Sequence, residues 1–183
     1  MQKLLGEVID AHGGIDRWNR FSTLTAHLKQ GGLIWPLKGK GGMLGEVDIQ
    51  VKLHEPWTSH SPFGAPGRRT AVTPQRAAIE SADGALIEEA LSPRASFAGH
   101  QLDTPWSDLQ LAYFVGYAIW NYLTVRFTLA GPGFSVEELS PWLENGEQWR
   151  RLRVNFLYVR DADGGHQPEP LVVSIDVSAI QFT

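Results

Sequence analysis

Two different spacings of hydrophobic residues divide the chain. In the N-terminal part the apolar positions recur every three or four residues, which is the spacing of an amphipathic helix, at Leu4, Leu5, Val8, Ile9, Ile15, Trp18 and Phe21. The pair Gly13-Gly14 should break this helix into two. From Ser22 onward apolar and polar residues alternate, with turn residues between the runs, which is typical of antiparallel strands.

The alternating part of the sequence predicts a series of strands. The most regular alternation covers residues 47–53, and further strands are expected at 23–30, 69–72, 77–80, 85–90, 149–160 and 171–182. An aromatic and mostly apolar run at 109–125 predicts one long central helix. Ser135 and Glu138 have the spacing of a capping box, which predicts a short helix at 135–139. The chain should therefore fold as an α+β protein with about six to eight strands.

Length and composition fit one soluble domain over residues 1–183. Apolar residues make up 43% of the chain and charged residues 20%, which is typical of a globular protein. The net charge is −4 and no long run of Lys and Arg occurs, so we expect no nucleic-acid partner. The absence of cysteine excludes disulfides, thiolate metal sites and a cysteine nucleophile.

The sequence also bears on membranes and export. The apolar run at 109–125 is at the short limit for a membrane span, and aromatic residues fill its middle, so we expect a buried helix instead. At the N-terminus Glu7 and Asp10 fall where a secretory signal needs an apolar stretch. We therefore expect a cytoplasmic protein without a membrane span.

Several stretches of the chain resemble an uncharacterised bacterial protein family with a LolA-like, lipoprotein-carrier-like half-barrel fold. They are residues 93–100 (PRASFAGH), 103–106 (DTPW), 113–123 (YFVGYAIWNYL), 132–134 (PGF), 149–152 (WRRL) and 169–177 (EPLVVSIDV). The resemblance implies a curved antiparallel sheet with the N-terminal helix pair, the aromatic-rich central helix on its concave side, and a cavity for an apolar ligand. The chain is shortened relative to this family, because Phe156 runs directly into Leu157 where the family has further strands. The sheet should then be more open.

The central helix supplies the candidate ligand-binding residues. Tyr113, Tyr117, Trp120 and Asn121 are spaced three, four or seven residues apart, so they share one face of the helix. Together with Trp106 they can line a cavity for a small, mostly apolar molecule, with the phenols and the amide as orienting groups. The same aromatic stripe would also suit an ordinary hydrophobic core.

The loop before this helix concentrates the candidate catalytic residues. Arg94, His100 and Asp103 bring a guanidinium, an imidazole and a carboxylate close together in the sequence. In an enzyme, His100 would act as acid or base, Asp103 would orient it, and Arg94 would bind an anionic group of the substrate. The alternative is structural, because Asp103 or Thr104 can simply cap the following helix.

The sequence lacks the motifs of a metal site, of a nucleotide-binding loop and of a nucleophile elbow. His54 and His60 have no third ligand at a suitable spacing, and no nucleotide-binding loop or nucleophile elbow occurs, so neither a metal nor a cofactor is expected. The sequence thus predicts a ligand-binding protein. An enzyme that uses the same cavity and a structural subunit remain the alternatives.

The last secure strand suggests how the protein associates. Its apolar residues fall on one face, and the shortened sheet would leave that face partly uncovered, namely Leu152, Val154, Phe156 and Tyr158. Because an uncovered apolar patch beside an open strand edge usually marks an interface, we expect a symmetric homodimer.

Overall fold

The computed structural model describes residues 2–156, and their contacts form two compact units. One unit is Asn19–Val125, and the other contains the N-terminal residues through Trp18 and the chain from Arg126 onward. The single half-barrel domain expected over residues 1–183 stays a prediction.

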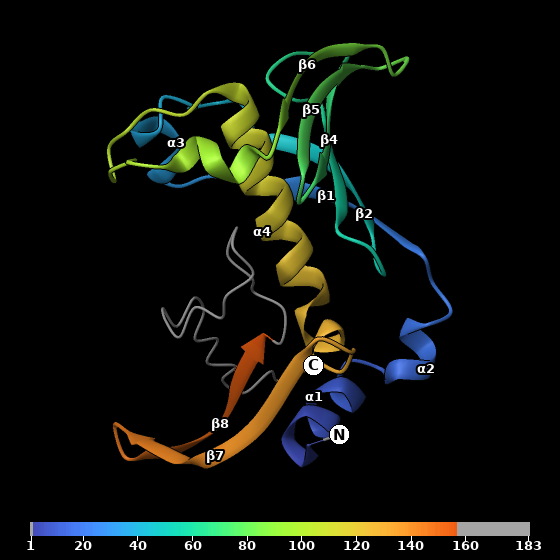
Figure 1. The fold of residues 1–183 in the computed structure, drawn as a ribbon, viewed down its shortest axis with the longest axis vertical. Coiled ribbons are helices and arrows are strands. Elements are labelled where there is room, and N and C mark those ends of the chain that lie inside the picture. Colours follow the sequence, from blue (N-terminus) through green and yellow to red (C-terminus); the bar gives the residue numbers. More distant parts are fainter. Residues whose placement is uncertain (1, 157–183) are drawn as a thin grey trace. The chain divides into compact units, whose positions relative to one another are not determined.

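The larger unit is built on an open, six-stranded antiparallel sheet (Figure 1). Its strands follow one another in chain order, so that each pairs with the next: β1 Thr23–Lys29, β2 Glu46–Lys52, β3 Trp57–Ser61, β4 Arg68–Thr73, β5 Arg76–Ser81 and β6 Leu86–Leu91. The short helices α3 (Ile34–Leu37) and η1 (Pro93–Phe97) lie in the connections, and the long helix α4 covers Asp108–Thr128. The α+β class and the central helix are confirmed, and the unclosed sheet is consistent with a curved half-barrel.

Alternation placed five of these strands correctly. The strands expected at 23–30, 47–53, 69–72, 77–80 and 85–90 are β1, β2, β4, β5 and β6, with ends that differ by at most one residue. Strand β3 was not predicted. Its inward-facing residues Thr58 and His60 are polar, so the stretch lacks the apolar alternation by which the other strands are found.

One face of the sheet and one side of α4 form the main core. Val47, Ile49 and Val51 of β2 are buried at every second position and pack in one cluster with Leu111 and Val115 of α4. Gly116 lets the helix approach the sheet closely. A Cβ at this position would lie 2.6 Å from Thr58 Oγ1 and 3.0 Å from the side chain of Val72. Helix α4 is therefore fixed directly on β3 and β4.

Helix α4 begins with a reciprocal cap. The Ser107 hydroxyl accepts from the Gln110 N–H at 3.1 Å, and the Gln110 side-chain carbonyl accepts from the Ser107 N–H at 2.8 Å. Asp108 in the first turn complements the helix dipole. The expectation that Asp103 or Thr104 caps the helix is therefore wrong, because Ser107 already satisfies the first amides.

The smaller unit contains the predicted N-terminal helix pair. Helix α1 covers Lys3–Ala11 and α2 covers Ile15–Trp18, and between them Gly13 and Gly14 adopt φ angles of 99° and 83°, which other residues rarely take. Leu5 and Ile9 are buried against Phe127, on which the Trp18 ring stacks at 4.2 Å. The break at the two glycines is confirmed.

The smaller unit also contains a hairpin that corrects one prediction. Residues 135–139, expected to be a helix, belong to strand β7 (Phe134–Glu144), which pairs with β8 (Glu147–Phe156). Arg150 pairs with Glu138 at 2.7 Å across the hairpin, so the glutamate of the supposed capping box serves a cross-strand ion pair. The strand expected at 149–160 is confirmed as far as Phe156. Residues 157–160 and the strand expected at 171–182 lie outside the described residues.

Candidate functional site

A cavity of about 280 Å³ lies between helix α4 and the β1 side of the sheet in the larger unit. Its lining comes from β1, the residue after it, α3, β3 and one side of α4, as Leu28, Gln30, Ile34, Trp35, His60, Phe114, Val115, Ala118, Ile119 and Tyr122. All of these residues except Gln30 and His60 are apolar or aromatic. Such a lining suits a small, mostly apolar molecule.

His60 is the more deeply buried of the two polar lining residues. It pairs with Ile49 of β2 in the sheet register, its backbone N–H donates to Thr70 Oγ1 at 2.9 Å, and it is 1% exposed. Its Nδ1 atom is buried and has no hydrogen-bond partner among the described residues. Burial lowers the pKa of His60 to about 4, so the imidazole is neutral at neutral pH.

Gln30 is the second polar lining residue. Its backbone N–H donates to the Gly45 carbonyl at 2.9 Å, which fixes the chain just after β1. Its amide Nε2 is buried and also has no hydrogen-bond partner among the described residues. A buried polar group without a partner costs about 1–3 kcal/mol. The two polar residues that line the cavity therefore each have one buried side-chain nitrogen without a partner among the described residues.

The tyrosines that the sequence singled out lie on another side of α4. The rings of Tyr113 and Tyr117 stack at 6.0 Å, and Tyr113 also lies 6.1 Å from the ring of Phe97 in η1. Burial raises the pKa of Tyr113; the neighbouring Tyr117 adds to this shift and the Arg94 charge opposes it. Neither tyrosine lines the cavity.

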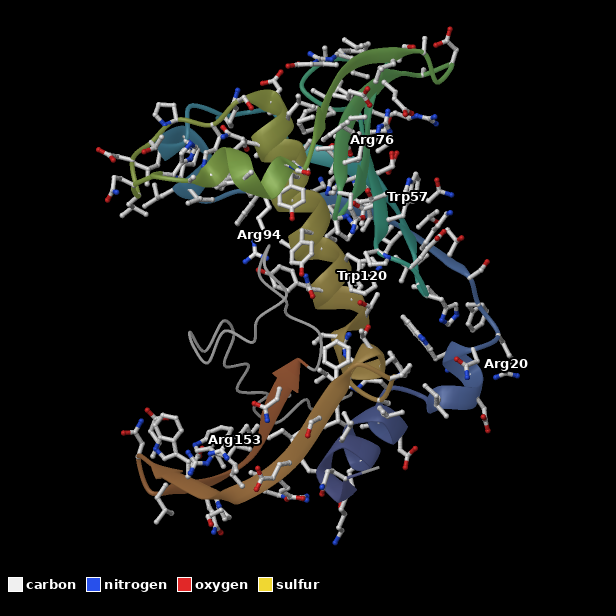
Figure 2. The ribbon with its side chains drawn as sticks, viewed as in Figure 1. Arg20, Trp57, Arg76, Arg94, Trp120 and Arg153 are labelled. Carbon is white, nitrogen blue, oxygen red and sulfur yellow. The ribbon has the colours of Figure 1, made fainter. Side chains whose placement is uncertain are left out.

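The remaining ligand candidates have structural contacts. The Trp120 indole N–H donates to the backbone carbonyls of Lys52 and Glu55 at 2.9 and 3.0 Å, which ties α4 to the end of β2 (Figure 2). Asn121 donates to the Tyr117 carbonyl one turn earlier in the helix at 2.8 Å. Trp106 is buried, with the ring of Phe114 at 4.7 Å. These three residues also lie outside the cavity lining.

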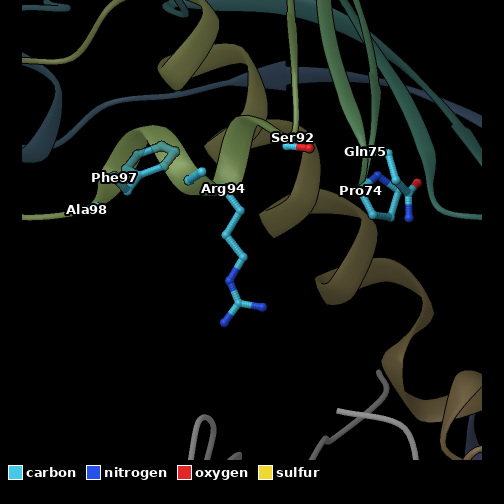
Figure 3. A pocket seen from close by; sticks show the side chains of 7 residues that line it. Pro74, Gln75, Ser92, Arg94, Phe97 and Ala98 are labelled. Carbon is cyan, nitrogen blue, oxygen red and sulfur yellow. The ribbon is translucent and has the colours of Figure 1, made fainter. Parts of the chain in front are cut away.

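Arg94 lies at a second, shallower hollow of about 660 Å³ beside η1. Its side chain extends away from η1, while Pro74 and Gln75 at the β4–β5 turn form the other side (Figure 3). Arg94 is exposed and forms no ion pair with any residue that the structure describes. The hollow is open to solvent, where water satisfies polar groups at little cost.

The other two catalytic candidates are not brought together. The His100 ring lies 5.6 Å from the Phe97 ring, and its Nε2 is 3.4 Å from Gln110 Nε2. Asp103 is exposed, and within residues 2–156 no hydrogen bond joins it to His100. The described geometry therefore lacks the oriented histidine that acid–base chemistry would need.

A buried lysine that sequence analysis missed holds the candidate loop in place. Lys38, after α3, is 4% exposed, and its Nζ donates to the backbone carbonyls of Gln101, Leu102 and Thr104 at 2.5–3.3 Å. The same ammonium lies 5.0 Å from the centre of the Trp106 ring. Lys38 therefore fixes the loop through its main chain.

The two spaced histidines do not form a metal site in the described part of the chain. His54 is exposed and its Nε2 lies 2.8 Å from the Phe21 carbonyl oxygen, whereas His60 faces the cavity. Among residues 2–156 no cluster of three potential ligands could hold a metal ion. In the same range no helix is both long enough and apolar enough to cross a membrane.

Comparison with protein-family models, with curated proteins and with solved structures finds no match. The resemblance to the LolA-like family therefore stays a prediction from the sequence. The case for a function depends on the geometry of the cavity and on the chemistry of its lining.

Proposed function

We propose that this protein binds a small, mostly apolar molecule in the cavity between α4, β1 and β3. The observation that carries the proposal is a cavity whose lining is apolar or aromatic except for Gln30 and His60. Ligand pockets commonly combine apolar walls with a few placed polar groups. The volume of about 280 Å³ is near the lower end of the usual range of about 300–1,000 Å³, so the ligand is small.

A plain hydrophobic core explains these features less well. Protein interiors have few voids larger than a water molecule, and their buried polar atoms are nearly always hydrogen-bonded. Here a cavity lies beside Gln30 and His60, each of which has a buried side-chain nitrogen without a partner among the described residues; Thr58, Arg68 and His100 carry further such atoms elsewhere. Trp35 also forms a fixed part of the wall, because its indole N–H donates to the Gly31 carbonyl at 3.1 Å. A preformed wall favours binding, since little must be ordered when the ligand enters.

The enzyme alternative has less support. It needs His100 and Asp103 within hydrogen-bond reach of one another beside a cavity, and the described residues contain no such bond. Arg94 lies at the shallow hollow beside η1 and not at the cavity between α4, β1 and β3. No specific observation supports the alternative of a structural subunit.

Native mass spectrometry of freshly purified protein tests the proposal. The wild type should retain an added mass that denaturation releases. The variant Ala118→Leu fills the cavity from α4 and should lose this mass, whereas Tyr117→Leu, one position away on the open side of the helix, should keep it. Absence of a bound mass, together with no binding of added toluene or benzyl alcohol by the wild type, would contradict the proposal.

We also propose that the protein forms a symmetric homodimer through the β7–β8 hairpin. Support comes from Trp142 and Leu143 near the hairpin tip, which are 45% and 72% exposed. The predicted patch is smaller than expected, because Leu152 packs within its own unit against the cluster of Leu5 and Ile9. Light scattering over a dilution series should give a dimer mass, and Trp142→Ser should lower it; a monomer at high micromolar concentration would contradict the dimer.

A further inference from the structure

Resting on the proposed function, we infer that Lys38 is a positioning residue for the cavity between α4, β1 and β3. Helix α3 supplies Ile34 and Trp35 to the cavity lining, and Lys38 directly follows this helix. Its ammonium group holds α3 against the loop between η1 and α4. Two consequences are expected: removal of the ammonium weakens ligand binding, and a bound ligand stabilises a loop that does not line the cavity.

Helix α3 is too short to be stable by itself. It contains four residues, Ile34–Leu37, whereas isolated helices shorter than about 12–15 residues are marginal in water. The surrounding chain adds backbone freedom, because six of the fifteen residues at 31–45 are glycine. The position of α3 must therefore come from contacts with other parts of the larger unit.

Lys38 supplies such contacts through both its side chain and its main chain. Its Nζ atom donates to three carbonyls of the loop that runs beside α3 (Figure 1), at Gln101, Leu102 and Thr104. An ammonium group carries three hydrogens, and hydrogen bonds from a charged donor are stronger than neutral ones. The Trp106 N–H in turn donates to the Lys38 carbonyl at 3.0 Å. The end of α3 is thus bound to one loop from two directions.

The burial of this ammonium makes its hydrogen bonds decisive. Lys38 is 4% exposed, and its Nζ lies 5.0 Å from the centre of the Trp106 ring, where an apolar side chain would also be in contact. Burial of a charge costs free energy unless hydrogen bonds compensate for it. A small shift of α3 would break these bonds before water replaced them, which is costly. Lys38 therefore holds α3, and with it Ile34 and Trp35, in one position.

The same contacts couple the cavity to the loop. A ligand that packs against Ile34 and Trp35 favours the position of α3 in which Lys38 reaches the loop carbonyls. Such coupling is reciprocal, so whatever loosens the loop also weakens binding. Trp35 reports the position of α3, because its indole N–H donates to the Gly31 carbonyl at 3.1 Å and exchanges with solvent when this bond opens.

The variant Lys38→Met tests this role in the full chain. It removes the ammonium and keeps a long side chain beside Trp106. Without ligand, hydrogen exchange at the Trp35 indole should become at least about threefold faster, while exchange at the Trp120 indole, which is bonded at the end of β2, should not change. The affinity for benzyl alcohol, measured by chemical-shift titration, should fall by at least about fivefold, because the wall must then be ordered as the probe binds.

The matched control is Lys29→Met, which removes an exposed ammonium that pairs with Glu46 at 2.8 Å. Both the Trp35 indole exchange and the affinity should stay within about twofold of the wild type. Urea denaturation of the two variants measures stability separately. A loss of stability in Lys38→Met, with wild-type exchange at Trp35 and wild-type affinity, would show that Lys38 supports the fold alone and would overturn the inference.

A measurement on the wild type tests the coupling without any substitution, and it applies even if Lys38→Met does not fold. Saturating benzyl alcohol should slow exchange of the Thr104 amide, which donates to the Gln101 carbonyl at 3.2 Å, by at least about threefold. The Gly84 amide, in the turn between β5 and β6 at the other edge of the sheet from β1, should not respond. No change at Thr104, or an equal change at Gly84, would overturn the inference.

The outcomes separate this role of Lys38 from the proposed function. If neither benzyl alcohol nor toluene binds the wild type and no mass is retained, the proposed function fails. The exchange of the Trp35 indole in the free protein then still decides whether Lys38 positions α3. If benzyl alcohol binds the wild type and Lys38→Met equally well, the proposed function stands and the inference fails.

Discussion

Two sides of the same helix in the larger unit place neighbouring aromatic residues beside different partners. Tyr113 and Tyr117 of α4 face the open side near Phe97, and Tyr117 is 49% exposed. Phe114 and Tyr122, which are 40% and 69% exposed, line the cavity together with His60, which is 1% exposed. Buried polar atoms without a partner among the described residues occur on both sides, on Gln30 and His60 beside the cavity and on His100 beside Phe97. The apolar lining of the cavity, and not these atoms, therefore indicates a ligand.

The comparison also shows what helical spacing can and cannot reveal. Spacing correctly indicates that Tyr113 and Tyr117 share a side of α4, because residues three or four apart are neighbours on a helix. It does not reveal which side meets a cavity. Helix α4 carries apolar residues all around, so its rotation is set by close packing at Gly116 against Thr58 and Val72.

The largest loss of stability is expected for Trp106, because it contacts aromatic residues on both sides of α4. Trp106 lies 5.7 Å from Phe97, which lines the open hollow, and 4.7 Å from Phe114, which lines the cavity. Trp106→Ala should lower the free energy of unfolding by about 3–5 kcal/mol, as truncation of buried aromatic residues does. Urea denaturation measures the loss. The exposed Trp142→Ala should cost less than about 1 kcal/mol, and an equally small loss for Trp106→Ala would mean that the two sides are supported separately.

The next largest effect is the pH dependence of stability that the buried His60 causes. His60 has a pKa of about 4 in the folded protein and about 6.5 when unfolded, so the unfolded state binds the proton first as the pH falls. The free energy of unfolding should therefore decrease by about 3 kcal/mol between pH 6.5 and pH 4 on account of this residue. Urea denaturation of the wild type and of His60→Gln over this range measures the difference. If both proteins lose the same stability, His60 is not desolvated.

A smaller effect tests what fixes the rotation of α4. Gly116→Ala would place a Cβ 2.6 Å from Thr58 Oγ1, and the resulting overpacking should cost about 1–3 kcal/mol. The matched change Ala118→Leu extends into the cavity instead and should cost less than about 1 kcal/mol. Thermal denaturation compares the two variants. A larger loss for Ala118→Leu would show that the cavity side is the more tightly packed one.

The fold was predictable wherever local pattern and tertiary structure agree. Strand β2 follows its alternation closely, because Val47, Ile49 and Val51 all face the core. Strand β7 was mistaken for a helix on the evidence of Ser135 and Glu138, although the chain carried a stronger local signal. Asn145-Gly146 is a typical two-residue hairpin turn, and both residues adopt positive φ angles of 51° and 81°.

The site was less predictable, because it depends on contacts between distant parts of the chain. His60 was considered only as a metal ligand with His54, yet its surroundings come from the register with Ile49 and from α4. Lys38 bonds to carbonyls more than sixty residues away, at Gln101 and Leu102. A lysine or histidine in a polar stretch gives no local sign that it is buried. Whether such a residue is buried depends on which distant strands and helices pack against it.

The smallest effect completes the comparison between the two sides of α4. Tyr117→Phe removes one hydroxyl from the open side, where the side chain is 49% exposed and water replaces its contacts. Stability should change by less than about 0.5 kcal/mol, and the affinity for benzyl alcohol should remain within about twofold of the wild type. Phe114→Leu on the cavity side removes part of the lining and should weaken the same affinity by at least about fivefold. Chemical-shift titration measures both. If Tyr117→Phe weakens binding more than Phe114→Leu does, the ligand occupies the open side, as the sequence alone had suggested.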